Sequence, residues 1–238
     1  MALPKAFAFD VFGTVVDWRT SIARESGPFL CEIGRADIDA EEFADAWRGR
    51  YIKVMTEFSR SGREFVVLDV LHREMLEDAL NEYGVDAARL DEELLVDWNN
   101  AWHRLDPWPD SPEGLARLKT KFPIVTLSNG NVALMVEMAK RGNLPWDAIL
   151  GAEYSRSYKP DPKTYLGTVA ALGLQPHEVC LVAAHHGDLA AARALGMQGA
   201  YVARPMEYGG KRAPDADMVQ DWEFSATSMT ELAALVGC

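Results

Sequence analysis

The 238-residue chain contains few cysteines, and they are not spaced for a disulfide framework or a zinc site. Cys31, Cys180 and Cys238 are an odd number, and no two of them have the C-x-x-C spacing. No apolar run approaches the ~20 residues that a membrane-spanning helix needs. Met1 to Lys5 also lack the basic head and the long apolar stretch of a signal peptide. These absences predict a protein of the reducing cytoplasm that has no membrane partner.

Positive charge is scarce as well. Lys and Arg total 24 against 36 Asp and Glu, which gives a formal net charge of -12. This charge repels phosphate backbones and anionic membranes, so nucleic acid is excluded as an expected partner. An apolar fraction of 48%, with no repeat or low-complexity segment, predicts a folded chain with a sizeable core.

The order of predicted elements favours an α/β fold. Short apolar runs bounded by turn or cap residues predict buried strands at Phe7–Phe9, Ile124–Leu127, Val179–Ala184 and Ala200–Val202. Helical patterns lie between the later runs, at Asn131–Arg141, Asp161–Leu172 and Leu189–Leu195. This alternation predicts a mostly parallel sheet with right-handed crossovers. The spacing Ser228-x-x-Glu231 predicts the start of a last helix.

The stretch from residue 18 to residue 109 has helical periodicity throughout. Asp39 and Glu42 form a capping-box-like start. Three apolar stripes follow, namely Phe43, Trp47, Val54 and Phe58, then Leu68, Leu71, Met75, Ala79 and Tyr83, then Leu94, Leu95, Trp98, Trp102 and Leu105. The sequence therefore predicts a helical domain over 18–109 inserted into an α/β core of residues 1–17 and 110–238. Ser111 is expected to cap the next helix, with Pro112 at its first position.

Reactive side chains follow the predicted strands. In an open parallel sheet, ligands bind beyond the carboxyl ends of the strands, where the strand order reverses. A carboxylate, small polar donors, an ammonium group and a second carboxylate should therefore meet in one crevice. The candidates are Asp10, Phe12, Thr14, Ser128, Asn129, Lys159, His185, His186 and Asp188.

These motifs, in this order, resemble the haloacid dehalogenase (HAD) superfamily. The segments "FDVFGTVVDW", "LSNGN" and "YKPDPKTY", together with the Trp47-Arg48 pair, resemble the 2-haloacid dehalogenases that are usually specific for L-2-haloacids. The resemblance covers nearly the whole chain. It implies a HAD-like Rossmannoid parallel sheet with an inserted all-helical cap, a small anionic haloacid substrate and a homodimer.

Phe12 bears on the type of reaction. Phosphatases of the superfamily carry an aspartate two positions after the nucleophile, where it protonates the leaving alkoxide. A halide leaves without a proton, so an apolar Phe12 is compatible with dehalogenation. Asp188 is followed by Ala192 and Arg193, where a further magnesium-binding acid would be expected. The resemblance therefore implies an enzyme with neither metal nor cofactor.

The resemblance also implies a role for each candidate residue. Asp10 attacks the carbon that bears the halogen, and water then hydrolyses the resulting ester to a 2-hydroxy acid. Lys159 keeps Asp10 ionised, while Asp188 pairs with Lys159 and helps to hold the water. The remaining expected roles are an orienting contact to Asp10 from Thr14, substrate carboxylate or halide binding by Ser128 and Asn129, a lining role for Tyr165, and halide binding by Arg48, with Arg50 as a competitor for that place.

One segment departs from the family pattern S-x-N-x-x-D, because this chain has Ala183, His185 and Asp188 there, with Gly187 in place of an aromatic residue. His185 is expected to accept a proton from water and to narrow the pocket. This predicts short substrates such as haloacetates, including fluoroacetate.

Two other functions stay open. A phosphatase of the same superfamily is supported by the Gly187-Asp188 pair and opposed by Phe12. A non-catalytic binding module of the same fold is opposed by the intact set of Asp10, Lys159 and Asp188.

Overall fold

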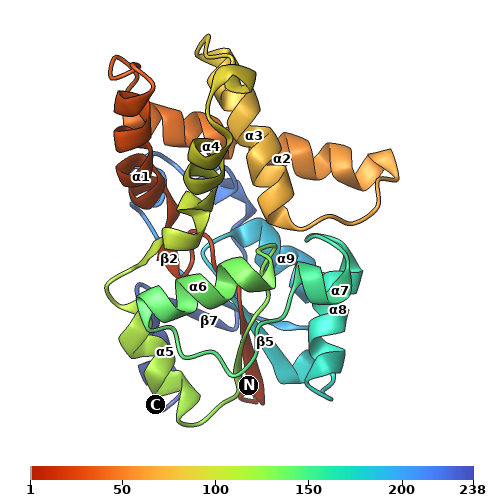
Figure 1. Cartoon of the computed structure of the whole chain (residues 1–238). Helices are drawn as coiled ribbons and strands as arrows, with labels where there is room; N and C mark the ends of the chain where they lie inside the picture. The colour runs from red at the N-terminus through yellow and green to blue at the C-terminus, as the bar shows by residue number, and fades with distance from the viewer. Residues whose placement is uncertain (1) are drawn as a thin grey trace. The chain divides into compact units, whose positions relative to one another are not determined.

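A computed structural model describes residues 2–238, apart from the side chains of residues 52, 56, 57 and 59–61. Its internal contacts divide the chain into two units (Figure 1). The α/β unit comprises Met1–Asp17 and Asp106–Cys238, and the helical unit comprises Trp18–Leu105.

A five-stranded parallel sheet forms the centre of the α/β unit, with the strand order β4-β1-β5-β6-β7. Its strands are β1 (Ala6–Phe9), β4 (Ile124–Thr126), β5 (Val179–Ala183), β6 (Gln198–Val202) and β7 (Phe224–Ala226). The predicted α/β class with a parallel sheet is confirmed. Because β1 lies between β4 and β5, the strand order reverses beside β1, and ligand sites are expected at the carboxyl end of this strand.

The fifth strand was not predicted from the sequence. Strand β7 contains only Phe-Ser-Ala and pairs with β6 through Ala200↔Phe224 and Val202↔Ala226. Three residues with an exposed serine do not form an apolar run that could be recognised beforehand. The strand exists because the neighbouring β6 offers it a ladder of hydrogen bonds.

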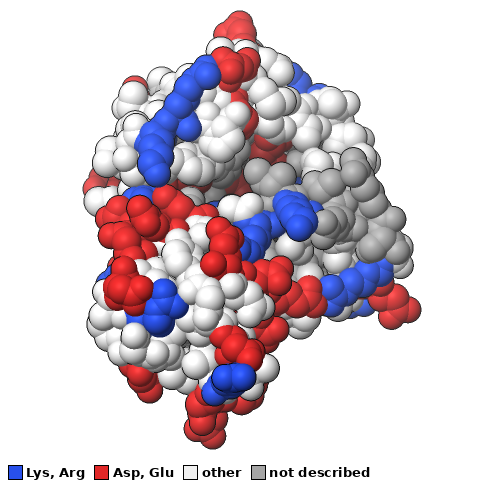
Figure 2. Space-filling model, turned by 90° about the horizontal axis from the view of Figure 1, so that it is seen from above, with Lys and Arg blue, Asp and Glu red and all other residues white. Residues whose placement is uncertain are grey.

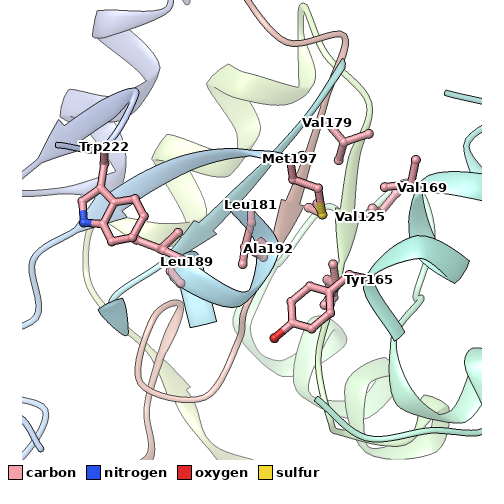
Figure 3. Packing of buried hydrophobic residues seen from close by; sticks show 12 residues of the cluster. Val125, Tyr165, Val169, Val179, Leu181, Leu189, Ala192, Met197 and Trp222 are labelled. Carbon is pink, nitrogen blue, oxygen red and sulfur yellow. The ribbon is translucent and has the colours of Figure 1, made fainter. Parts of the chain in front are cut away.

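Helices cover both faces of the sheet. They are α5 (Ser111–Lys119), α6 (Val132–Gly142), α7 (Ala152–Ser155), α8 (Pro162–Ala171), α9 (His186–Ala194) and α10 (Met229–Leu235), with short turns η3 (Pro176–Glu178) and η4 (Ala216–Met218). Ala8, Val125 and Leu181 share one face by register, and there they pack with residues of α8 and α9. Figure 3 shows this cluster, with Trp222 on one side and Tyr165 and Val169 on the other.

Phe7 and Phe9 point to the opposite face, because side chains alternate along a strand. Phe7 packs edge-on against Phe122, with ring centroids 5.1 Å apart. Phe9 lies 5.3 Å from Trp146. Helices α5 and α10 contact each other, and they also contact β4 and β6, respectively. The sheet is therefore buried on both sides, which fixes the positions of the strand ends.

A two-stranded antiparallel ribbon is formed by the residues that directly precede and directly follow the helical segment. Strand β2 (Val16–Asp17) pairs with β3 (Asp106–Pro107) through Val16↔Pro107 and Asp17↔Asp106. This pairing assigns residues 106–109 to the α/β unit, whereas the sequence pattern placed the end of the helical segment at 109. The reason is that Asp106 and Pro107 join a strand rather than continue the preceding helical turns.

The expected cap at Ser111 is wrong by one residue. Ser111 is already helical, and its hydroxyl donates to the carbonyl of Val15 at 2.8 Å. Asp110 stands at the cap position without a side-chain capping bond, because its carboxylate accepts from Arg204 and from the backbone N–H of Met229. The predicted cap at Ser228 is confirmed, since its side chain accepts from the backbone N–H of Glu231.

The helical unit contains α1 (Trp18–Glu32), α2 (Ala40–Ser61), α3 (Leu68–Glu82), η1 (Ala87–Arg89), α4 (Glu92–Asn99) and η2 (Asn100–Arg104). Asp39 caps α2 by accepting from the backbone N–H groups of Glu41 and Glu42. Aromatic rings fill the interior of the helical unit. Trp47 packs edge-on against Trp102, with ring centroids 5.5 Å apart. The predicted stripes therefore contribute core residues, as their helical spacing indicates.

The charge of the visible surface agrees with the acidic composition. Figure 2 shows acidic side chains spread over the visible face, with basic side chains in smaller groups. Over the described part of the chain, no helix combines the length and the apolar character needed to cross a bilayer.

Leu181→Ala is expected to lower the free energy of unfolding by ~2–5 kcal/mol, because Leu181 is fully buried in β5 and its truncation leaves a cavity. Urea unfolding of the purified variant measures this loss. Leu166→Ala, on the exposed face of α8, serves as the matched control and should change stability by no more than about 0.5 kcal/mol. Equal effects of the two substitutions would contradict the described core.

Candidate active site

The centre of the site is a lysine shared by two carboxylates. Lys159 Nζ donates to Asp10 Oδ1 at 2.8 Å and to Asp188 Oδ2 at 2.5 Å. Asp10 directly follows β1, Asp188 lies in the first turn of α9, and Lys159 precedes α8. About a tenth of each of the three side chains is exposed. The three residues that the sequence placed at separate strand ends are thus brought together.

The second oxygen of Asp10 is held from the other side. Thr14 Oγ1 donates to Asp10 Oδ2 at 2.7 Å, and Thr14 Oγ1 itself accepts from the backbone N–H of Ala184 at 2.9 Å. His185 Nδ1 lies 3.0 Å from the same Oδ2. The Asp10 carboxylate is therefore fixed in one orientation by groups from β1, β5 and the start of α9.

Glu207 belongs to this arrangement, although the sequence analysis missed it. Its two carboxylate oxygens lie 2.9 and 3.1 Å from His185 Nε2, and its side chain is buried. Glu207 lies in the segment that follows β6, in "RPMEYGG". The signal that could have found it is its position after the carboxyl end of a parallel strand, which is also where Asp10, Ser128 and His185 lie.

Electrostatics keep Asp10 ionised. Burial acts to raise the pKa of Asp10, but the charge of Lys159 and the hydrogen bond from His185 outweigh it and hold the pKa well below its usual range. Burial likewise acts to lower the pKa of Lys159, but Asp10 and Asp188 raise it overall. An unprotonated carboxylate and a protonated ammonium group therefore face each other at neutral pH.

The two histidines have different surroundings. Burial acts to lower the pKa of His185, but Glu207 and Asp10 raise it well above 6.5. Both ring nitrogens face carboxylates, and only an imidazolium can donate to both. In this geometry a protonated His185 ring has no nitrogen left to accept a proton from water, so the expected role stays a prediction that these contacts oppose. His186 is structural, since its Nδ1 accepts from Trp222 Nε1 at 3.0 Å and its ring stacks on Tyr201.

Ser128 and Asn129 lie beside the lysine segment. Asn129 Oδ1 accepts from the backbone N–H of Lys159 at 2.8 Å, and Ser128 Oγ accepts from the N–H of Gly130 at 3.1 Å. Phe12 is buried and lies near Gly130, where an added Cβ would be 3.3 Å from Phe12 Cε2. These contacts place all three residues at the same edge of the sheet as Asp10.

Tyr165 connects the core to the site. Its ring is fully buried in the cluster between the sheet and α8, and its hydroxyl donates to Asp188 Oδ1 at 2.6 Å (Figure 3). The sequence analysis expected Tyr165 to line the site, and the two ends of this side chain do different things. The ring packs, whereas the hydroxyl orients the carboxylate that pairs with Lys159.

Arg48 and Arg50 lie in α2 of the helical unit. The Arg48 guanidinium lies 4.3 Å from the ring centre of Tyr51, and it also lies over the rings of Trp18 and Trp102. Arg50 instead forms an ion pair with Glu82 and donates to backbone carbonyls. Arg50 thus has a role within the helical unit. This leaves Arg48 as the stronger candidate for the residue that binds a ligand.

The residues around Asp10 do not fit a magnesium ion. Such an ion would bind the Asp10 carboxylate and further oxygens at 2.0–2.1 Å. Here Lys159, Thr14 and His185 already hold both oxygens of Asp10, and two of these groups are cations. Within residues 2–238, no group of three His, Cys, Asp or Glu side chains is arranged to hold a metal.

The parallel sheet and the pair of Asp10 and Lys159 at the end of its first strand are typical of α/β hydrolases. The model of the haloacid dehalogenase-like hydrolases matches residues 4–196. The chain belongs to this family.

Relatives within the family are close in both sequence and structure. The chain is 30% identical to the (S)-2-haloacid dehalogenase 1 of a Pseudomonas species, over 86% of this chain and 88% of that protein. A crystal structure of a defluorinating L-2-haloacid dehalogenase superposes with a TM-score of 0.94 at 46% identity, covering 99% of this chain and 96% of the other. The L-2-haloacid dehalogenase of Xanthobacter autotrophicus, solved with chloropropionic acid covalently bound, gives a TM-score of 0.80 at 25% identity, covering 98% of each chain.

The different surroundings of His185 and His186 predict pKa values that an NMR titration can measure. In an NMR titration of the five histidines, His185 should titrate well above 6.5, because Glu207 and Asp10 favour its charged form. His186 should titrate below 6.5, because burial disfavours its charge. The variants His185→Gln and His186→Gln assign the two resonances. A His185 that titrates at or below 6.5 would contradict the described contacts.

Proposed function

We propose that this protein is a hydrolytic 2-haloacid dehalogenase that acts through an ester on Asp10. The proposal is carried mainly by the ionised Asp10, which is paired with Lys159 and followed two positions later by the apolar Phe12. The names of the relatives support the same reaction, since they are (S)- or L-2-haloacid dehalogenases.

In the first step, an oxygen of Asp10 attacks the carbon that bears the halogen. The carbon–oxygen bond forms as the carbon–halogen bond breaks, and the halide leaves with the bonding electron pair. The carbon is inverted, as in any attack from behind the leaving group. The covalent chloropropionic acid in the Xanthobacter enzyme supports an intermediate of this kind.

In the second step, water hydrolyses the ester. Asp188 takes a proton from the water while the water oxygen bonds to the carboxyl carbon of Asp10. The bond between that carbon and the ester oxygen then breaks, and Lys159 protonates the departing alkoxide. Asp188 returns its proton to Lys159 across their hydrogen bond. The second proton of the water leaves the Asp10 carboxyl group, which regenerates the carboxylate. The products of this step are a 2-hydroxy acid and one proton.

Other residues bind the substrate. Ser128 and Asn129 bind its carboxylate, Arg48 binds the departing halide, and Phe12 contacts its alkyl part. The helical unit Trp18–Leu105 is the cap domain of the family. Thr14 orients Asp10, and Tyr165 lines the site through its contact with Asp188.

The reaction proceeds without a metal. A halide needs no proton to leave, so the aspartate that phosphatases carry two positions after the nucleophile is not required, and Phe12 takes its place. The cationic charge that a phosphatase obtains from magnesium is supplied here by Lys159 and His185.

Chloroacetate and 2-chloropropionate should release chloride in the presence of EDTA. In heavy-oxygen water, repeated turnover should label the carboxylate of Asp10, because each hydrolysis places a solvent oxygen on it. Mass spectrometry of the Asp10 peptide measures the label. Asp10→Asn should lower turnover by about 10⁴-fold or more, since the amide is no nucleophile.

Asp39→Asn is the matched control, because Asp39 caps α2 in the helical unit and asparagine caps a helix as well as aspartate does. It should leave turnover unchanged. Labelled product with unlabelled Asp10 would contradict the ester route. Magnesium-dependent hydrolysis of p-nitrophenyl phosphate without chloride release would instead identify a phosphatase, and neither activity would favour a binding module.

The substrates are short, and they include fluoroacetate. The His185 ring, held between Asp10 and Glu207, occupies space at the carboxyl end of β5 and leaves less room for a longer alkyl chain. The similarity to a defluorinating relative supports the release of fluoride.

Fluoroacetate should release fluoride, detectable with a fluoride electrode. His185→Ala should raise the ratio of kcat/KM for 2-chlorobutyrate over chloroacetate by about 10-fold or more, because a pocket enlarged by this truncation accepts the additional methylenes. The ratio cancels any loss of catalysis that is common to both substrates. An unchanged ratio would refute the proposed role of His185 in chain-length selection.

Cytoplasmic location and a homodimer stay predictions.

A further inference from the structure

Glu207 and His185 form a charged arrangement beside Asp10, in which Glu207 is buried and His185 is partly buried. Glu207 is 2% exposed, and its carboxylate lies against Gly13, where an added Cβ would be 2.1 Å from Glu207 Oε1. Gly13 has φ of 82° and no side chain, which leaves this space to the glutamate. His185 Nδ1 lies 3.0 Å from Asp10 Oδ2 and Nε2 lies 2.9 Å from Glu207 Oε1, so the ring is held between the two carboxylates.

The two oxygens of Asp10 are not equivalent. A carboxylate oxygen has two in-plane lone pairs. Both lone pairs of Oδ2 are engaged, by Thr14 Oγ1 and by His185 Nδ1. Among the described residues, Oδ1 accepts a single hydrogen bond, from Lys159, and keeps one lone pair for attack. Oδ1 is therefore the nucleophile, and Oδ2 becomes the carbonyl oxygen of the ester.

We propose that His185 and Thr14 form the site that stabilises negative charge on Asp10 Oδ2 during ester hydrolysis, and that Glu207 is the positioning residue that holds His185 there. This inference rests on the proposed function. When water attacks the carboxyl carbon, the electron pair of the carbonyl bond moves onto Oδ2. It returns as the bond to the ester oxygen Oδ1 breaks. Donors already in place at Oδ2 lower the barrier of this step.

The positive charge of His185 follows from its neighbours. With His185 neutral, the cluster would hold three carboxylates against the single positive charge of Lys159. With His185 protonated, it holds three negative and two positive charges. The charged and titratable groups around the ring are Asp10 from the end of β1, Glu207 after β6, Lys159 before α8, and Asp188 and His186 from α9.

Glu207→Gln keeps the size of the side chain and removes its charge. Ester hydrolysis should slow by roughly 10- to 100-fold, less than or similar to the loss of an oxyanion donor. Halide release in the first turnover should stay within about 3-fold of the wild type, because that step does not place charge on Oδ2. Rapid quench with chloroacetate should then show a burst of chloride and a carboxymethyl group on Asp10 in the intact-protein mass.

The pH dependence separates positioning from a purely structural role. The favourable contribution of His185 is fully present while the ring is protonated and is lost as the pH rises through its raised pKa. Without the charge of Glu207 this pKa falls, so ester hydrolysis in Glu207→Gln should decline at a lower pH than in the wild type. The amplitude of the chloride burst counts the folded, active enzyme, so partial misfolding does not affect the comparison.

Two further variants serve as controls. Glu223→Gln neutralises another partly buried, ion-paired glutamate of the α/β unit, one that binds Arg193 and the N–H of Gly199. It should leave both steps and the pH profile unchanged. His185→Asn provides an amide donor that needs no charge. Adding Glu207→Gln to His185→Asn should therefore change ester hydrolysis by less than about 3-fold.

The outcomes are distinguishable. If the wild type releases chloride and Glu207→Gln slows both steps equally, or keeps the wild-type pH profile, the role of Glu207 is overturned while the proposed function stands. If Glu207→Gln is equally damaging in the His185→Asn background, Glu207 does not act through His185 and the inference is again overturned. If the wild type releases no halide, the proposed function and this inference both fall.

Discussion

The arrangement of the site depends on the buried ammonium group of Lys159, which is shared by Asp10 and Asp188. Removing charges from water costs several kcal/mol for each ion, and only close, well-oriented partners compensate this cost. Each of the three residues comes from a different segment, so the ion pairs can form only when β1, the Lys159 segment and α9 have reached their final positions. The same contacts that keep Asp10 ionised therefore also require an accurately folded sheet edge. A sheet covered by helices on both faces meets that requirement, because its strand ends have little freedom to shift.

Packing and chemistry meet most directly at Tyr165 and at the start of α9. The ring of Tyr165 is part of the core between the sheet and α8, while its hydroxyl fixes Asp188. Helix α9 begins immediately after β5, so the register of β5 beside β1 sets how far His185 lies from Asp10. In this way the apolar cluster around Leu181, which reaches the charged groups through Tyr165, helps to determine the distances between them. Loss of packing there would be expected to affect the site before it disrupts the sheet.

Much of this arrangement could be predicted from the sequence, because the relevant residues directly follow recognisable apolar runs. Asp10, Ser128, Asn129, Lys159 and Asp188 all follow strands or precede helices with clear periodicity, and the structure brings them to one edge. Glu207 could not be predicted from the sequence, because it lies in a segment rich in turn residues that carries no strand or helix pattern. Its contact with Gly13 is formed only in the folded chain. The proton-accepting role expected of His185 took no account of Glu207, which favours the protonated form of the ring and so opposes that role. Strand β7 and the ribbon of β2 with β3 are too short to leave a pattern, since they form only when a partner strand is beside them.

The close approach of Gly13 and Glu207 has a consequence for altering this enzyme. The two positions are far apart in the chain, yet the glutamate occupies the space that any side chain at position 13 would need, and the backbone at 13 adopts a conformation that other residues avoid. A side chain at position 13 is therefore penalised both by the glutamate and by the backbone conformation, and a shorter residue at 207 would remove only the first of these penalties. Libraries that randomise one position at a time would not contain variants that combine a side chain at position 13 with a shorter residue at position 207.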